Sequence, residues 1–219
     1  MALKNVIFDL DGTLVDSLPG IEHSVDHALK QRGYPVRTRE LRPLIGPPIR
    51  SILRTVSGET DPAALDALEA AFRMAYDSEG WTKTVLQPQV KETLSWIASC
   101  GGSLFIVTNK PSGPAASITE RLGLLVSEMV SPDSANPPYR SKAEMIQRLM
   151  LGDDVHAGNS LVVGDTREDL EAAREVGMAA VIVTTGYGRF TKTPDAEPCR
   201  KIETLGELKS VIAETGGFA

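Results

Sequence analysis

Short apolar runs that alternate with helix-patterned segments restrict the fold of this chain more than any other feature of its sequence. The runs are typical of buried parallel strands and lie at 5–8, 104–107, 128–130, 161–163 and 180–183. Helical patterns lie between the later runs and end at glycines, which commonly terminate helices: 111–122, 142–151 and 167–176. This alternation predicts an α/β protein with a doubly wound parallel sheet.

Residues 17–85 have a different pattern and contain no convincing strand. Helical periodicity in this segment spans 21–31, 49–56 and 63–76. We therefore expect two domains, with hinges near Asp16 and Val85. The core domain would comprise residues 1–16 and 86–219, and an all-helical cap domain of residues 17–85 would interrupt it after the first strand.

Composition and charge exclude several classes of function. Hydrophobic residues make up 42% of the chain, which is ordinary for a globular protein and argues against disorder. The net charge is −6 and no Lys/Arg cluster offsets it, so we expect neither a nucleic-acid nor a membrane partner. The two cysteines, Cys100 and Cys199, lack metal-ligand spacing, and no run of about 18 apolar residues occurs. We expect a cytoplasmic protein.

Two carboxylates follow the first predicted strand. Asp9 and Asp11 flank Leu10, and Gly12 permits a tight turn directly after them. One interpretation is an ordinary turn in which a solvated Asp bonds to its own backbone. The other is a nucleophile and a general acid/base that face a bound divalent metal, because two close acids repel each other unless a cation lies beside them. We favour the second interpretation.

Polar residues also follow two later strands of the predicted sheet. Thr108 and Asn109 are suited to hold a phosphoryl oxygen, although helix capping is the favoured interpretation of these residues taken alone. Asp165 follows Gly164, and Asp169 comes one helical turn later, so both carboxylates can lie near one helix start. Ligands of open α/β sheets bind beyond the carboxyl ends of strands, and these residues are expected there.

Together these motifs resemble those of the haloacid dehalogenase-like hydrolase superfamily. The segment 9–17 reads DLDGTLVDS, Thr108 and Lys142 stand where the family has a hydroxyl residue and a lysine, and 164–169 reads GDTRED. Thr108 to Pro111 and Thr185 to Gly188 are similar to the phosphoglycolate phosphatase-like branch. The resemblance covers essentially the whole chain and implies a Rossmann-like core with a helical cap.

The resemblance also implies a reaction and a role for each motif. It implies a magnesium-dependent phosphatase that hydrolyses a small phosphorylated metabolite through an aspartyl-phosphate, with phosphoglycolate as the first guess. Asp9 would be the nucleophile and Asp11 the general acid/base. Mg²⁺ would be held by Asp9, Asp165 and the backbone carbonyl of Asp11. Phosphate would be held by Thr108, Asn109 and Lys142. Gly12, Gly164 and Asp169 would support the site, and Asp169 would orient Lys142 or a metal-bound water.

Alternatives remain open at this level. A phosphomutase of the same superfamily, such as a beta-phosphoglucomutase-like enzyme, would keep every one of these residues. A non-catalytic binding protein on the same fold is a further alternative, although Asp9 is present. Lys110, Lys83 and Arg140 compete with Lys142 as the cation beside the phosphate.

Overall fold

The computed structural model describes residues 3–36, 41–152, 154–188 and 199–218. The chain divides into two compact units, one of Met1–Val15 and Leu86–Ala219 and the other of Asp16–Val85. The chain passes between them through β2 (Val15–Asp16) and β3 (Val85–Leu86), which pair with each other. In the described part of the chain, no helix has the length and apolar character needed to span a membrane.

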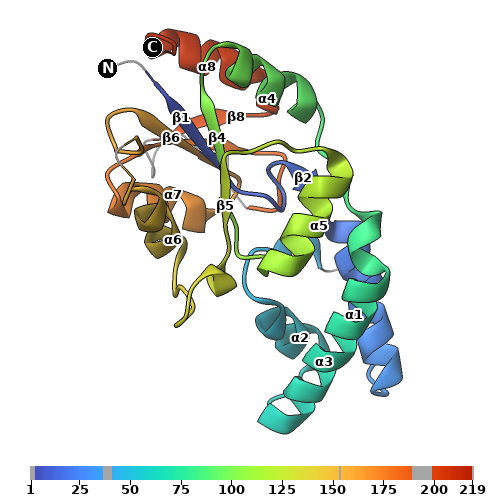
Figure 1. Cartoon of the computed structure of the whole chain (residues 1–219). Helices are drawn as coiled ribbons and strands as arrows, with labels where there is room; N and C mark the ends of the chain where they lie inside the picture. The colour runs from blue at the N-terminus through green and yellow to red at the C-terminus, as the bar shows by residue number, and fades with distance from the viewer. Residues whose placement is uncertain (1–2, 37–40, 153, 189–198, 219) are drawn as a thin grey trace. The chain divides into compact units, whose positions relative to one another are not determined.

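The larger unit contains a six-stranded sheet in the order β5-β4-β1-β6-β7-β8 (Figure 1), and each adjacent pair of strands is parallel. This confirms the predicted doubly wound α/β class. The strands are β1 (Asn5–Phe8), β4 (Ser103–Val107), β5 (Glu128–Val130), β6 (Ser160–Gly164), β7 (Ala179–Val183) and β8 (Arg200–Ile202). β8 was not predicted, because only Ile202 of its three residues is buried and the sequence therefore carries no apolar run.

Five helices surround this sheet: α4 (Val90–Ser99), α5 (Ser112–Leu122), α6 (Lys142–Leu149), α7 (Arg167–Glu175) and α8 (Leu208–Glu214). Helices α6 and α7 pack together, and their apolar side chains form one core cluster with Ile7, Val107 and Val162 of the sheet. α5 ends at Gly123 in a left-handed conformation, as predicted. α6 ends at Leu149, earlier than the predicted residue 151.

The order of the strands places a topological switch point at β1. From β1 the sheet continues on one side through β4 to β5, and on the other side through β6, β7 and β8. Loops that follow the carboxyl ends of β4, β1 and β6 therefore open a crevice between them, which is where ligands of such sheets bind.

The smaller unit is built from α1 (Leu18–Gln31), α2 (Ile49–Ser57) and α3 (Pro62–Ser78), with α3 in contact with both of the others. Gly20 on α1 lies directly against Gly80, which follows α3. A Cβ atom on Gly20 would lie 2.1 Å from the Gly80 carbonyl oxygen, so only glycine permits this approach. The helical nature of this segment agrees with the sequence analysis.

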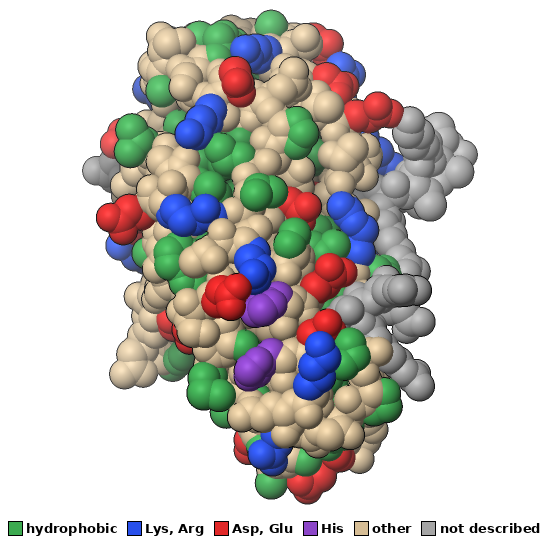
Figure 2. Space-filling view, turned by 90° about the vertical axis from the view of Figure 1, so that its right-hand side faces the viewer, with side chains coloured by type: hydrophobic (Ala, Val, Ile, Leu, Met, Phe, Trp, Pro, Cys, Tyr) green, Lys and Arg blue, Asp and Glu red, His purple; other side chains and the backbone are tan. Residues whose placement is uncertain are grey.

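The surface shown in Figure 2 carries basic and acidic side chains interspersed rather than separated by sign. The molecule has a net charge of −6, so this face offers no large positive field to a polyanion. An anionic small ligand would therefore be bound by local groups inside a site.

Candidate active site

Asp9 and Asp11 occupy the turn that follows the central strand β1. The Asp9 amide donates to the carbonyl oxygen of Val163 on β6 at 2.9 Å, which extends the sheet by one residue. Gly12 then has a φ of +96°, which allows the backbone to turn back at once. The side chain of Asp9 is 5% exposed and that of Asp11 is 19% exposed. The structure thus buries the first carboxylate and leaves the second partly exposed.

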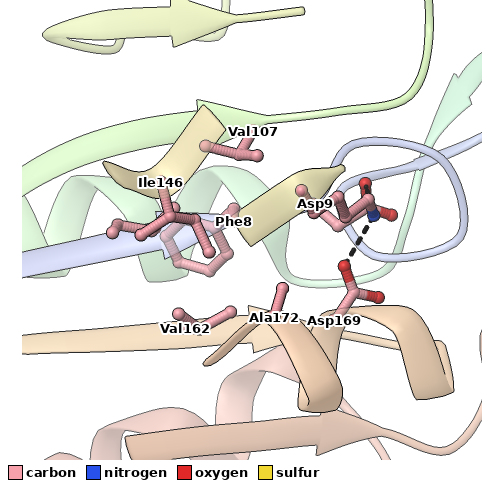
Figure 3. Close-up of a pocket in the computed structure, with 9 residues that line it drawn as sticks. Phe8, Asp9, Val107, Ile146, Val162, Asp169 and Ala172 are labelled. Carbon is pink, nitrogen blue, oxygen red and sulfur yellow. Dashed lines mark hydrogen bonds and ion pairs between the residues drawn. The ribbon is translucent and has the colours of Figure 1, made fainter. Parts of the chain in front are cut away.

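Lys142 bridges two carboxylates at the base of the site. Its Nζ donates to Asp9 Oδ1 at 2.7 Å and to Asp169 Oδ1 at 2.6 Å, and all three side chains are buried. Figure 3 shows Asp9 and Asp169 at one end of an apolar wall that includes Phe8 and Ile146. The stem of Lys142 lines this pocket, so its position is fixed by packing as well as by charge.

Two of the other candidate cations, Lys83 and Arg140, do not contact Asp9 or Asp11. Lys83 forms an exposed ion pair with Glu79 at 2.6 Å in the smaller unit. Arg140 is exposed, and its backbone amide bonds to Glu144. The structure therefore places Lys142 against the predicted nucleophile.

Burial governs the charge state of these groups. It raises the pKa of Asp9 well above its ordinary value, and the neighbouring carboxylates of Asp169 and Asp165 add to this increase, while Lys142 opposes it. For Lys142, burial alone would lower the pKa of the ammonium group, but Asp169 and Asp9 outweigh this and raise it. Lys142 therefore stays charged, and Asp9 lies where additional positive charge would stabilise its ionised form.

Asp165 follows β6 and is fully buried. Its Oδ1 accepts a hydrogen bond from the Thr13 hydroxyl at 2.9 Å, and its Oδ2 accepts from the Tyr187 amide at 2.6 Å. Burial and the nearby Asp169 carboxylate raise the pKa of Asp165 to about 6, although these hydrogen bonds oppose the shift. An ionised Asp165 thus also requires a cation close by.

Glycines enclose Asp165 on three sides. A Cβ atom on Gly12 would lie 2.4 Å from Asp165 Oδ2, one on Gly186 would lie 2.3 Å from the Asp165 side chain, and one on Gly188 would lie 1.8 Å from its carbonyl oxygen. Any other residue at Gly12 or Gly186 would displace the carboxylate, and any other residue at Gly188 would displace the backbone of Asp165. The turn after β1 and the loop after β7 thus position Asp165 together.

Asp169 has two functions within the fold. Its Oδ2 accepts hydrogen bonds from the Thr166 amide at 2.9 Å and the Thr166 hydroxyl at 2.6 Å, which completes a capping box at the start of α7. Its Oδ1 accepts from Lys142. Gly164 makes this possible, because a Cβ atom there would lie 2.2 Å from Asp169 Cγ.

The carboxylates also form a set of possible metal ligands. One oxygen each of Asp9, Asp165 and Asp169 lie within 4.8 Å of one another, and all three residues are buried. Carboxylate oxygens are the ligands that hard divalent cations prefer. Burial and the neighbouring carboxylates raise the pKa of Asp9 and of Asp165, and a bound cation would offset both effects, so these residues fit a bound cation.

The loop after β4 supplies the remaining predicted residues. Thr108 is buried, and its hydroxyl accepts from the Lys110 amide at 3.1 Å. Asn109 donates from its side-chain amide to Glu168 at 2.8 Å. Neither residue caps α5, which begins at Ser112. The amide of Ser112 is bound by Asp133 at 2.9 Å, so the capping interpretation of this strand end is wrong.

Sequence reasoning missed several contacts in the site. The sequence motif predicts no contact for Thr13, yet its hydroxyl donates a hydrogen bond to Asp165 at 2.9 Å. From sequence, Lys110 is only an alternative to Lys142 as the phosphate-binding cation, whereas in the structure its Nζ lies 3.0 Å from Asp11 Oδ2. The sequence of the loop with Gly186 and Gly188 indicates a family likeness but not its contact with Asp165. Because these contacts join distant parts of the chain, no local pattern in the sequence marks them.

Comparisons with known proteins agree with this geometry. A family model described as haloacid dehalogenase-like hydrolase matches residues 6–183. A protein of Pseudomonas savastanoi pv. phaseolicola named phosphoglycolate phosphatase is 32% identical over 215 residues, covering 94% of this chain and 78% of that protein.

Solved structures are similar to this chain over nearly its whole length. The crystal structure of a predicted phosphoglycolate phosphatase from Haemophilus somnus matches with a TM-score of 0.85 and 26% identity, covering 95% of this chain and 97% of that chain. A structure described as Mycobacterium tuberculosis Protein Tyrosine Kinase A matches with a TM-score of 0.80 and 29% identity, covering 96% and 98%. The family model spans well over half of the sequence, and this chain therefore belongs to the haloacid dehalogenase-like hydrolase family.

Proposed function

We propose that this hydrolase is a magnesium-dependent phosphatase that acts on a small phosphate monoester through an aspartyl-phosphate intermediate. The observation that carries the proposal is the Asp9 carboxylate, buried at the end of β1 and held by the ammonium group of Lys142 at 2.7 Å beside Asp165. A buried acid with a raised pKa and a dedicated cation is typical of a catalytic group. Relatives named phosphoglycolate phosphatase support phosphoglycolate as the first substrate to test.

Asp9 would attack phosphorus in line, and the bond between phosphorus and the leaving oxygen would break. This divides the hydrolysis into formation and breakdown of a covalent intermediate. Lys142 would orient Asp9 and offset the negative charge that repels the phosphate dianion. Asp169 would act through Lys142, which matches the contact between them at 2.6 Å.

Asp11 would transfer protons on both sides of the intermediate. In the first step it would donate a proton to the leaving alcohol, and in the second it would accept one from the attacking water. Its side chain is more exposed than that of Asp9, which suits a group that exchanges protons with the leaving group and with water.

Mg²⁺ would be held by Asp9, Asp165 and the backbone carbonyl of Asp11. When bound, it would neutralise charge on the phosphoryl oxygens as a Lewis acid. The remaining phosphoryl oxygens would be bound by Thr108 and Lys142, with Asn109 beside them. Thr13, Tyr187 and the enclosing glycines would fix Asp165 for its role as a ligand.

The test is inorganic phosphate release from a panel of small phosphate esters, with magnesium and with excess EDTA. We expect release that chelation removes and magnesium restores, and a much higher magnesium requirement for Asp165→Ala because one of few carboxylate ligands is lost. Full activity in EDTA would contradict the metal site. Isomerised phosphate ester in place of inorganic phosphate would assign the chain as a phosphomutase.

A further inference from the structure

Glu168 makes a hydrogen bond across the site that the proposed mechanism does not use. Asn109, in the loop after β4, donates from its side-chain amide nitrogen to Glu168 Oε2 at 2.8 Å. Glu168 lies in the first turn of α7, 59 residues further along the chain. Because β1 lies between β4 and β6 in the sheet, this bond spans the carboxyl end of β1, which Asp9 follows. It therefore joins the two loops that flank the predicted nucleophile.

The stability of α7 does not by itself account for Glu168. An acid in the first turn of a helix is favoured by the helix dipole, but Asp169 already caps this helix. Glu168 adds a further negative charge directly next to Asp169 in the chain, in a site that would bind a phosphate dianion. Like charges repel each other, so a further acid is unfavourable here unless its charge serves another contact. The bond to Asn109 is such a contact.

This bond fixes the orientation of the Asn109 side chain. A carboxylate only accepts hydrogen bonds, so Asn109 must direct its NH₂ group and not its carbonyl oxygen toward Glu168. The amide of an asparagine otherwise rotates between two orientations about its last torsion. The NH₂ group also carries a second N–H, which the bond to Glu168 does not use. Glu168 therefore selects the orientation in which Asn109 can donate a further hydrogen bond.

The neighbours of Asn109 in the chain show where this second N–H can act. The Thr108 hydroxyl accepts from the Lys110 amide at 3.1 Å, so its own proton can be donated to an anion. Lys110 Nζ lies 3.0 Å from Asp11 Oδ2, so the loop of 108–110 runs beside the turn after β1. Asn109 lies between Thr108 and Lys110. The hydroxyl of Thr108 and the amide of Asn109 thus form two adjacent donors beside the predicted nucleophile.

We propose that Glu168 is a positioning residue that holds the Asn109 amide as a hydrogen-bond donor to the phosphoryl oxygens. This inference rests on the proposed phosphatase function and adds to it a residue of α7. Glu168 does not contact the substrate but acts through Asn109, as Asp169 acts through Lys142. Two adjacent residues of α7 thus each orient one phosphate-binding group of another element.

The test compares two neutral replacements of Glu168. Glu168→Gln keeps an oxygen that can accept from Asn109, whereas Glu168→Met keeps the length of the side chain without that acceptor. Both remove the charge, so the difference between them measures the acceptor alone. We would measure kcat and KM with the best ester of the panel, and the inhibition constant of inorganic phosphate, all with magnesium. Glu171→Met, at an exposed position on the same helix, is the matched control.

We expect KM and the inhibition constant of phosphate to be about three- to ten-fold higher in Glu168→Met than in Glu168→Gln. The reason is that an Asn109 side chain without its acceptor must be ordered when phosphate binds. We expect a smaller change in kcat, and wild-type constants for the control. Equal constants for the two Glu168 variants would overturn the inference, even if Glu168→Met had a lower Tm, because the bond would then serve stability alone.

Inverting the pair separates positioning from a purely structural link. In the double variant Asn109→Asp with Glu168→Gln, the amide and the carboxylate exchange places, so the net charge and a hydrogen bond between the loop and α7 are kept. We expect a Tm near that of the wild type but phosphate inhibition at least about ten-fold weaker, because a carboxylate now lies beside the phosphoryl oxygens. Wild-type inhibition by phosphate in this double variant would overturn the inference.

Failure of the proposed function gives a different result. If the folded wild type with magnesium released phosphate from no ester in the panel, the phosphatase function would fail, and the role of Glu168 would fail with it. Phosphate release by the wild type together with unchanged constants in every variant would overturn only the inference. If Glu168→Met does not fold, the inverted pair decides the question by its phosphate inhibition, because it keeps the hydrogen bond.

Discussion

Among the described residues, the larger unit has buried ion pairs in addition to exposed ones, whereas the ion pairs of the smaller unit all reach the surface. In the larger unit, Lys142 and its partners Asp9 and Asp169 are all at most 5% exposed, and Asp165 is fully buried. In the smaller unit, Arg50 is paired with Asp66, and their side chains are 34% and 69% exposed. Buried ion pairs cost desolvation energy that their attraction barely offsets, whereas exposed pairs contribute about 0–1 kcal/mol.

This difference indicates that the buried charges of the larger unit serve its chemistry rather than its stability. A fold that needed only stability would fill the base of the crevice with apolar side chains, as the neighbouring wall of Phe8 and Ile146 already does. The larger unit instead keeps carboxylates whose pKa values burial has raised. Replacing charges in the two units should therefore have very different effects on activity and stability.

The largest effect is expected for Asp9→Asn. An amide cannot attack phosphorus, so phosphate release should fall by a factor on the order of 10⁴ or more, while the far-ultraviolet circular dichroism spectrum stays that of the wild type. The amide keeps the size of the side chain, and its oxygen can still accept from Lys142. Phosphate release near the wild-type rate from this folded variant would refute the assignment of the nucleophile.

Lys142→Met is expected to come next. Removing the ammonium group leaves Asp9 and Asp169 without their common partner, which should lower kcat by at least about ten-fold and the free energy of unfolding by about 3–5 kcal/mol. Kinetics and urea unfolding of this variant measure the two effects. Lys83→Met is the control, because that lysine forms an exposed pair with Glu79 in the smaller unit.

A wild-type kcat for Lys142→Met together with a strongly reduced kcat for Arg140→Ala would assign Arg140 as the phosphate-binding cation. Loss of stability without loss of rate would reduce Lys142 to a structural residue.

Asp165→Asn tests the cost of the buried carboxylate in metal-free protein. The pKa of Asp165 is about 6 in the folded state and about 3.9 in an unfolded chain. Protonated Asp165 therefore stabilises the folded state at low pH, and this stabilisation is lost as pH rises through 6. The amide of the variant cannot ionise. In EDTA the variant should therefore gain about 1–3 kcal/mol of stability relative to the wild type between pH 4 and pH 7.

Urea unfolding at both pH values measures this difference. If the variant and the wild type had the same pH dependence in EDTA, Asp165 would be ionised at little cost and the argument for a required cation would weaken.

The smallest effect is expected for Arg50→Met in the smaller unit. Arg50 is paired with Asp66 and Glu69 and donates to the carbonyl oxygen of Pro62 at 3.1 Å, all near the surface. We expect a loss of about 1 kcal/mol or less in the free energy of unfolding and no change in kcat. A kcat for Arg50→Met as low as that of Lys142→Met would contradict the proposed difference between the two units.

The fold was predictable from sequence because its signals are local. Apolar runs marked β1, β4, β5, β6 and β7, and glycines marked helix ends. The convergence of Asp9 and Asp165 followed from a general property of parallel sheets, whose carboxyl strand ends lie together. Lys142 lies on α6 and was predicted only through the family resemblance.

The rest depended on tertiary contacts that leave no local signal. Strand β8 pairs with β7 through backbone hydrogen bonds, although two of its three residues are basic. The approach of Gly20 to Gly80 joins segments that are far apart in the chain. The contact of Lys110 with Asp11 likewise depends on the loops after β4 and β1 lying beside each other.

The most direct test of this account is to identify the residue that carries the phosphoryl group during turnover. The enzyme would be mixed with substrate and magnesium and quenched in acid within one turnover. Borohydride would then reduce any acyl phosphate, and the peptides would be sequenced by mass spectrometry. The account predicts homoserine at position 9 in the wild type and an unmodified amide side chain there in Asp9→Asn. Phosphate on another residue, such as Thr108, or turnover by the wild type with no modification at Asp9 in rapid-quench samples, would contradict it.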